Sequence, residues 1–158
     1  MKIRPLARKD RAGLLSLLIK TKAFTSKEID VAMELIDIVL KDRNQKDYMI
    51  ECAVNDQNEL VGYICYGPCP MTDGTFDLYW IAVSPGLQNK GAGSLLIDFL
   101  VEQIAKIQGR MILADTASIS EYTKVHRFYL GKGFQEVARI PDYYFQGNDR
   151  ITFCKRLI

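Results

Sequence analysis

The stretch YWIAVSPGLQNKGAGSLLIDFL, from Tyr79 to Leu100, runs from an apolar β-like segment through small and polar residues into an amphipathic helix. A glycine-bearing turn that opens a helix suits an anion. The first amides of the helix lack acceptors within it, and its dipole is positive at that end. The stretch therefore predicts a phosphate-binding turn.

Two familiar phosphate-binding motifs do not fit this turn. Gly86 and Gly91 have the spacing of a P-loop, but Ala92 and Gly93 stand where its Lys and hydroxyl residue belong. Gly91 and Gly93 supply the first two glycines of a dinucleotide fingerprint, but Leu96 replaces the third. The phosphate belongs to a different class of ligand.

Length and composition predict one globular domain covering residues 1–158. The chain is 48% hydrophobic and 25% charged, which is enough for a core. A net charge of +2 without a Lys/Arg patch indicates neither a nucleic acid nor a membrane partner. The N-terminus lacks the apolar core of a signal peptide, so we expect a cytoplasmic protein.

The four cysteines form no C-x-x-C pair, and the chain has a single histidine. Neither a disulfide framework nor a zinc site of recognised spacing is indicated. We expect reduced, mostly buried thiols and no metal.

Hydrophobic periodicity and turn residues predict the order of the secondary structure. The predicted strands lie at 2–4, 48–54, 60–66, 76–83, 111–114, 134–140 and 151–155. The first predicted helix lies at 10–20, and the second follows the capping box at 25–28 and has an apolar face that reaches residue 40. The third runs from the glycine turn to a cap at residue 109, and the fourth lies at 121–130. This order is typical of an α/β protein with mixed strand directions.

Two motifs give the chain a specific resemblance to a known family. An apolar-Ala-Val-x-Pro segment at residues 81–85 precedes Gln-x-x-Gly-x-Gly at 88–93, and Phe-Tyr-x-x-x-Gly-Phe follows at 128–134. The chain resembles the GCN5-related N-acetyltransferase (GNAT) superfamily over residues 60–140. The resemblance implies a central mixed, mostly antiparallel sheet flanked by about four helices.

The resemblance also implies acetyl-CoA as co-substrate, with its pyrophosphate on the glycine turn. The cofactor-binding residues carried over are Ile81, Ala82, Val83, Gln88, Asn89, Lys90, Gly91, Ala92, Gly93, Ser94 and Tyr122. Tyr122 stands where many members have an Asn that contacts the pantetheine arm, and some subfamilies resemble this chain in having Ser-x-x-Tyr.

Acetyl transfer to an amine needs a base, because an alkyl amine is protonated at neutral pH. Asp77 is placed like the catalytic glutamate of histone-type members. Strand alternation puts Tyr79 on the same side, where it could line the acceptor site. The alternatives are a strand-end carboxylate in solvent for Asp77 and a core residue for Tyr79.

The resemblance assigns Tyr129 to stabilise the departing thiolate, and the alternative is an aromatic that only packs at a helix end. Backbone N–H near Val83 would hold the thioester carbonyl. His126 is imaginable as a base, but a solvated histidine is favoured. Cys65 or Cys69 could carry the acyl group, although nothing beside either suggests an activated thiolate.

The aromatic run at 142–149, with Tyr143 and Tyr144, looks like the acceptor-side loop of the superfamily, where aromatic faces would suit a cationic amine. Its alternative is a hairpin loop that covers the sheet edge.

The leading hypothesis is an N-acetyltransferase that moves an acetyl group from acetyl-CoA to a primary amine of a small molecule or protein by direct attack in a ternary complex. Alternatives are a non-catalytic acyl-CoA sensor, a protein-interaction domain without ligand, and an enzyme acting on a hydroxyl. Whether the chain forms a homodimer is left open.

Overall fold

The computed structural model describes residues 1–158, which form two compact units. One unit comprises Met1–Pro68 and Tyr79–Leu100, and the other comprises Cys69–Leu78 and Val101–Ile158. Two elements contribute residues to both units: the strand β4 (Thr75–Val83), which divides after Leu78, and the helix α3 (Ala92–Lys106), which divides after Leu100. The prediction of one domain stays a prediction.

The first unit begins with one strand and two consecutive helices, and further strands follow. Its elements are β1 (Lys2–Pro5), α1 (Asp10–Thr21), α2 (Ser26–Lys41), β2 (Met49–Val54), β3 (Leu60–Pro68), the end of β4, the short 3-10 helix η1 (Pro85–Leu87) and the start of α3. β1 pairs antiparallel with β2, and β2 pairs antiparallel with β3.

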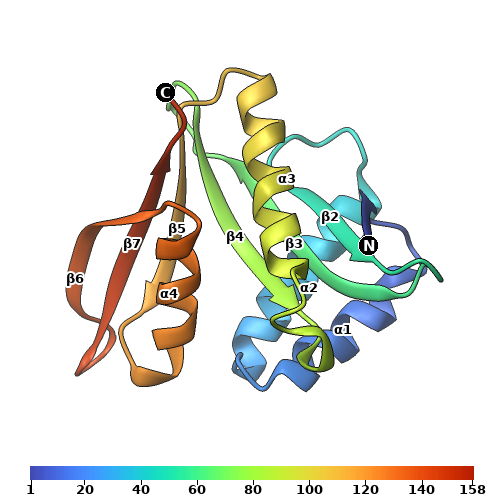
Figure 1. Cartoon of the computed structure of the whole chain (residues 1–158), viewed down its shortest axis with the longest axis horizontal. Coiled ribbons are helices and arrows are strands. Elements are labelled where there is room, and N and C mark those ends of the chain that lie inside the picture. The colour runs from blue at the N-terminus through green and yellow to red at the C-terminus, as the bar shows by residue number, and fades with distance from the viewer. The chain divides into compact units, whose positions relative to one another are not determined.

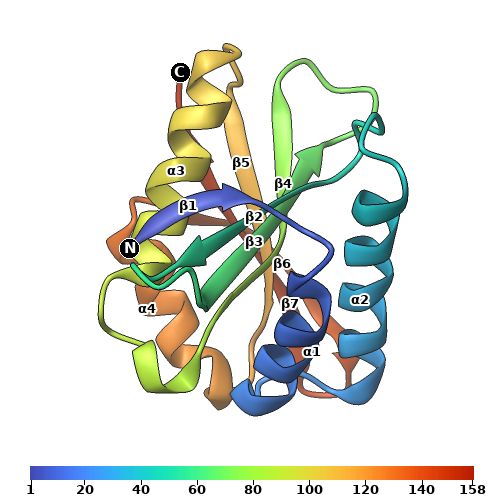
Figure 2. The same cartoon turned by 90° about the vertical axis from the view of Figure 1, so that its right-hand side faces the viewer.

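Helices α1 and α2 lie side by side against β2 and β3, as Figure 2 shows. Their fully buried side chains, among them Leu14, Leu18 and Ile36, meet Cys52 and Tyr63 of the strands. The predicted capping box is confirmed. The Thr25 side chain accepts from Glu28 N–H, and the Glu28 carboxylate accepts from Thr25 N–H at 2.6 Å.

The second unit contains the start of β4, the end of α3, β5 (Met111–Ala117), η2 (Ser120–Tyr122), α4 (Thr123–Gly131), β6 (Gln135–Phe145) and β7 (Asn148–Arg156) (Figure 1). β4 and β5 are parallel, so a crossover must join them, and α3 provides it. β7 pairs antiparallel with both β5 and β6. The hydrogen-bonded strand order is β1-β2-β3-β4-β5-β7-β6.

The predicted fold class, α/β with a mixed, mostly antiparallel sheet and four helices, is confirmed. Several boundaries were wrong, and β5 and β7 are each longer than predicted, since β5 continues to Ala117 and β7 begins at Asn148. The fourth helix begins with a 3-10 turn, so α4 starts at Thr123 rather than Glu121. β6 continues to Phe145, because Phe145 pairs with Asn148 of β7. Tyr143 and Tyr144 are therefore strand residues, not loop residues.

Glu51 of β2 makes the folded state sensitive to pH. Burial raises the pKa of its carboxyl from 4.5 to about 7. The folded chain thus holds this proton more tightly than the unfolded chain does. The associated stability is fully present below pH 4.5 and is lost as the pH rises through about 7.

We therefore expect the free energy of unfolding of Glu51→Gln, relative to that of the wild type, to be higher at pH 8 than at pH 4.5. The expected difference is about 1–2 kcal/mol, which allows for solvent screening of this partly exposed group. Denaturant unfolding of both proteins across this pH range measures the difference. Glu34→Gln, at an exposed position on α2, is the matched control. Parallel pH profiles for wild type and Glu51→Gln would contradict this assignment.

Candidate functional site

The glycine turn of the first unit has the backbone of an anion site. Gly91 and Asn89 have φ of 88° and 62°, in the left-handed region that favours glycine and asparagine. Leu95 N–H donates to Gly91 O at 2.9 Å, so the amides of Ala92, Gly93 and Ser94 precede the first helical bond of α3. These three amides are the donors that an anion at this turn would meet.

The polar side chains of the predicted pyrophosphate segment are accessible. Gln88, Asn89 and Lys90 are all exposed, whereas Ala92 is buried at 1% exposure. Ala92 can therefore contribute only its backbone. The segment fits a phosphate ligand because it combines free amides, an accessible cation and a turn without bulky side chains.

The end of β4 lies against β3 at a close backbone approach. A Cβ added to Gly62 would stand 2.6 Å from Ala82 O, so only glycine fits there. Ser84 N–H is already engaged by Val61 O at 2.8 Å. Ile81 and Val83 are half-buried on either side of buried Ala82.

Tyr79 packs in the first unit. Its ring meets Tyr48 edge-on, with 5.5 Å between centroids, and it lies against the same core cluster as its neighbour Trp80. Simple strand alternation therefore does not describe this part of β4. The packing favours the core alternative for the ring, while half-burial leaves part of it accessible.

In the second unit, Asp77 is half-buried and accepts a hydrogen bond from the Cys69 thiol. Burial, together with the nearby Asp77 carboxylate, raises the pKa of Cys69 to about 12. Burial alone raises that of Cys65 to about 12. Both thiols are neutral at physiological pH, which removes the thiolate that a covalent acyl route needs. Cys52, Cys65 and Cys154 are buried and free, as expected.

Tyr129 lies inside an aromatic cluster and is 4% exposed. Its ring contacts Phe128, Phe134 and Phe153, with centroids 5.2–5.7 Å away. Burial, with a smaller contribution from Tyr122, raises the pKa of Tyr129 well above its ordinary value. Its hydroxyl therefore keeps its proton at neutral pH and can act as a donor. The structure brings Tyr122 near Tyr129.

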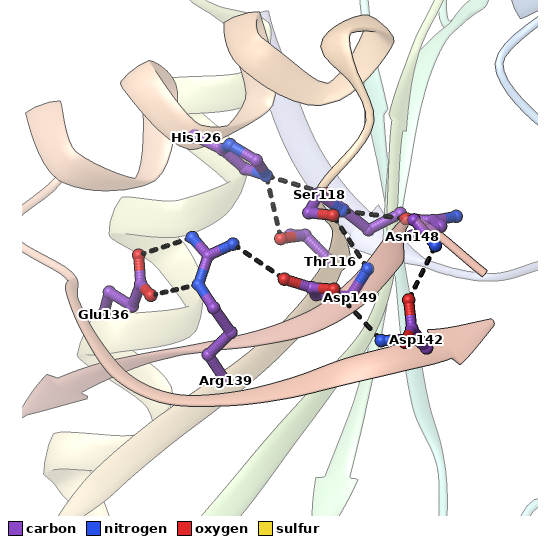
Figure 3. Close-up of polar contacts among 10 residues, drawn as sticks. Thr116, Ser118, His126, Glu136, Arg139, Asp142, Asn148 and Asp149 are labelled. Carbon is purple, nitrogen blue, oxygen red and sulfur yellow. Dashed lines mark hydrogen bonds and ion pairs between the residues drawn. The ribbon is translucent and has the colours of Figure 1, made fainter. Parts of the chain in front are cut away.

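His126 of α4 is not the solvated histidine that the sequence favoured. Its Nε2 lies 2.9 Å from Ala117 O and 3.0 Å from Thr116 Oγ1 (Figure 3). Its ring packs on Phe153, with 5.4 Å between the ring centroids. A carbonyl can only accept, so Nε2 carries a hydrogen. His126 thus joins α4 to the end of β5.

A polar network next to His126 joins the end of β5 to the β6–β7 hairpin (Figure 3). Asn148, 3% exposed, accepts from Ser118 N–H at 3.0 Å, and Ser118 Oγ accepts from Asp149 N–H at 2.8 Å. The Asp149 carboxylate accepts from Asp142 N–H and from Arg139. These bonds hold the strand that carries Tyr143 and Tyr144.

The structure adds two residues that the sequence reasoning missed. Arg150 of β7 pairs with Asp115 of β5 at 3.0 Å, and its guanidinium lies over the Tyr143 ring, 5.2 Å from the centroid. Tyr143 in turn meets Tyr144 edge-on at 5.0 Å. The only sequence signal for this pair was that Asp115 directly follows one predicted strand and Arg150 directly precedes another, and the pairing of those strands was unknown.

No three His, Cys, Asp or Glu side chains of the chain are arranged to hold a metal ion. None of the helices is long and apolar enough to cross a bilayer.

Comparison with known proteins identifies the family. The family model for the acetyltransferase (GNAT) domain matches residues 48–136. The crystal structure of a proposed GNAT-family acetyltransferase from Desulfovibrio desulfuricans superposes with a TM-score of 0.95 and 35% identity, covering 99% of each chain. No curated protein sequence matches significantly.

More distant structures share the fold. An aminoglycoside 6'-N-acetyltransferase complexed with coenzyme A has a TM-score of 0.77 and 19% identity, covering 100% of this chain and 98% of that one. The ribosomal-protein-S18-alanine N-acetyltransferase from Escherichia coli has a TM-score of 0.74 and 17% identity, covering 99% and 93%. The family match and the 35% identical structure together show that this chain belongs to the GNAT family of acetyltransferases.

Proposed function

We propose that this protein is an N-acetyltransferase that moves the acetyl group of acetyl-CoA to a primary amine by direct attack in a ternary complex. Family membership supports acetyl transfer, and a structural relative is complexed with coenzyme A. The single observation that carries the proposal is the glycine turn. Its left-handed residues and the first amides of α3, which precede the first helical bond, support a phosphate site within the family's motif.

Binding is assigned to the first unit. The turn from Gln88 to Ser94 takes the pyrophosphate, and the backbone of residues 81–83 lies along the pantetheine arm and its thioester carbonyl. Acetyl-CoA supplies the activated acyl group. The family resemblance also assigns Tyr122 to the pantetheine arm.

Proton transfer is assigned to two side chains of the second unit. Asp77 takes the proton of the acceptor amine, directly or through water, so that the neutral amine attacks the carbonyl carbon. As the carbon–sulfur bond breaks, Tyr129 O–H donates to the sulfur, which leaves as the thiol or a hydrogen-bonded thiolate. The neutral thiols of Cys65 and Cys69 support direct attack over a covalent route.

The first experiment separates enzyme, sensor and ligand-free domain. Coenzyme A should raise the melting temperature in a concentration-dependent way, since a ligand bound only to the folded state stabilises it by mass action. Acetyl-CoA should then release thiol in the presence of an amine panel. Stabilisation without thiol release on any amine would favour the non-catalytic sensor, and no stabilisation at all would contradict the proposal.

Asp77→Asn should slow turnover by roughly 10² to 10⁴-fold at neutral pH and much less at high pH, where the acceptor amine is already deprotonated. The pH profile of thiol release measures the contrast. Asp73→Asn, at an exposed position a few residues before β4, is the matched control. An equal loss at every pH would mean that Asp77 does not act as a base.

A further inference from the structure

Four side chains from three strands of the second unit form a group that we call the Arg150 cluster: Asp115, Tyr143, Tyr144 and Arg150. Arg150 Nη2 bonds Asp115 Oδ2 at 3.0 Å, and the two side chains are 32% and 40% exposed. Tyr143 and Tyr144 are 52% and 46% exposed. A small molecule can therefore reach the cluster.

The cluster already contains the cation that its aromatic and acidic groups would attract. The guanidinium of Arg150 lies over the Tyr143 ring. Both oxygens of Asp115 are engaged, since Oδ2 meets Arg150 and Oδ1 accepts from the Thr152 hydroxyl at 2.6 Å. A cationic ligand group would have to displace Arg150, so the cluster is a poor site for one.

The unsatisfied capacity belongs instead to the guanidinium. One of its five N–H donors, on Nη2, meets Asp115, and another reaches the Tyr143 side chain. Nε is buried without a partner and is out of reach of a ligand, so the spare donors are the remaining N–H groups of the two terminal nitrogens. A partly buried guanidinium with spare donors favours a planar anionic oxygen pair, and a carboxylate has that geometry.

The cluster also lies on the same face as the proposed base. Asp77 of β4 is opposite Leu113 of the parallel strand β5, and Asp115 is two residues further along β5. Alternation puts both carboxylates on one face, offset by about 7 Å along the strand. Arg150, which pairs with Asp115, extends this face towards the β6–β7 hairpin.

We propose that Arg150 is a specificity-determining residue that binds a carboxylate of the acceptor, so that the acceptors are amino carboxylates with several atoms between amine and carboxylate. Asp115 and Tyr143 position the guanidinium. This inference rests on the proposed N-acetyltransferase function.

The test uses ε-aminocaproate and two matched probes: ε-aminocaproamide, which lacks the negative charge, and hexamethylenediamine, which replaces it with a cation. In the wild type, KM for ε-aminocaproate should be roughly 10-fold to 100-fold lower than for either, because charge-assisted bonds to Arg150 form only with the carboxylate. Arg150→Gln should raise the KM for ε-aminocaproate to the level of the carboxamide, while the KM for the carboxamide itself should change several-fold less.

Three variants guard this result. Arg150→Lys keeps the charge but not the fork, and should restore part of the preference. The double variant Asp115→Asn/Arg150→Gln leaves no unpaired carboxylate, so its loss of preference cannot be a folding defect if coenzyme A still stabilises it. Arg156→Gln, at an exposed position on β7, should behave like the wild type.

Equal KM values for carboxylate and carboxamide in the wild type, a preference for the diamine, or a preference that survives Arg150→Gln would each overturn the inference. Calorimetric titration of the coenzyme A complex with ε-aminocaproate tests the carboxylate site independently of the proposed acetyl transfer. Arg150-dependent binding without thiol release supports the carboxylate site and contradicts the transferase. Thiol release with amines that have no carboxylate, and no preference for those that have one, supports the transferase and contradicts the carboxylate site.

Discussion

Tyr129→Phe is expected to lower turnover roughly 10-fold to 1000-fold while the affinity for coenzyme A barely changes. The substitution keeps the ring that packs against Phe134 and Phe153 and removes only the hydroxyl. Burial holds the pKa of Tyr129 high, so at neutral pH the hydroxyl is a donor throughout the reaction. A donor that acts mainly on the departing sulfur stabilises the transition state more than the ground state, so kcat and kcat/KM fall together.

Steady-state thiol release beside a thermal melt makes this measurement. Tyr63→Phe is the matched control, because Tyr63 is a second buried tyrosine, 1% exposed, whose hydroxyl has no hydrogen-bond partner. That variant should keep normal turnover and lose no stability. Near-normal turnover for Tyr129→Phe would return Tyr129 to a packing role and leave water to protonate the sulfur.

Gly91→Asp should weaken coenzyme A binding by roughly 100-fold or more, because two costs add at one position. The φ of 88° is strained for any residue with a Cβ, and the new carboxylate repels the pyrophosphate at the start of α3. Calorimetric titration with coenzyme A measures the loss. Gly91→Ala keeps the backbone strain without the charge, so its affinity for coenzyme A should lie between those of the wild type and Gly91→Asp.

Gly147→Asp is a closely matched control for this prediction. Gly147 has a φ of 86°, and a Cβ at Gly147, as at Gly91, would meet no heavy atom within 4 Å. The control thus adds the same charge and the same backbone strain in the β6–β7 hairpin. If both variants bind coenzyme A as the wild type does, the phosphate site lies elsewhere.

Local chemistry made several features predictable. The capping box at Thr25 and Glu28 starts α2 because both bonds form within one turn. The glycine turn begins α3 because Gly91 tolerates the left-handed backbone there. The two family motifs lie on the elements expected for them, and the comparisons confirm the family. The assigned roles of Asp77, Tyr129 and the turn stay proposals.

The sequence by itself determined the order and type of the elements, the family motifs and the glycine turn that begins α3, since each depends on residues a few positions apart. Only the tertiary structure decided that β6 continues through Tyr143 and Tyr144 to Phe145, which pairs with Asn148 of β7. It also decided that Asp115 and Arg150 meet, and that burial keeps the Cys69 thiol neutral. Strand register and burial arise from contacts between distant segments, and no local pattern encodes them.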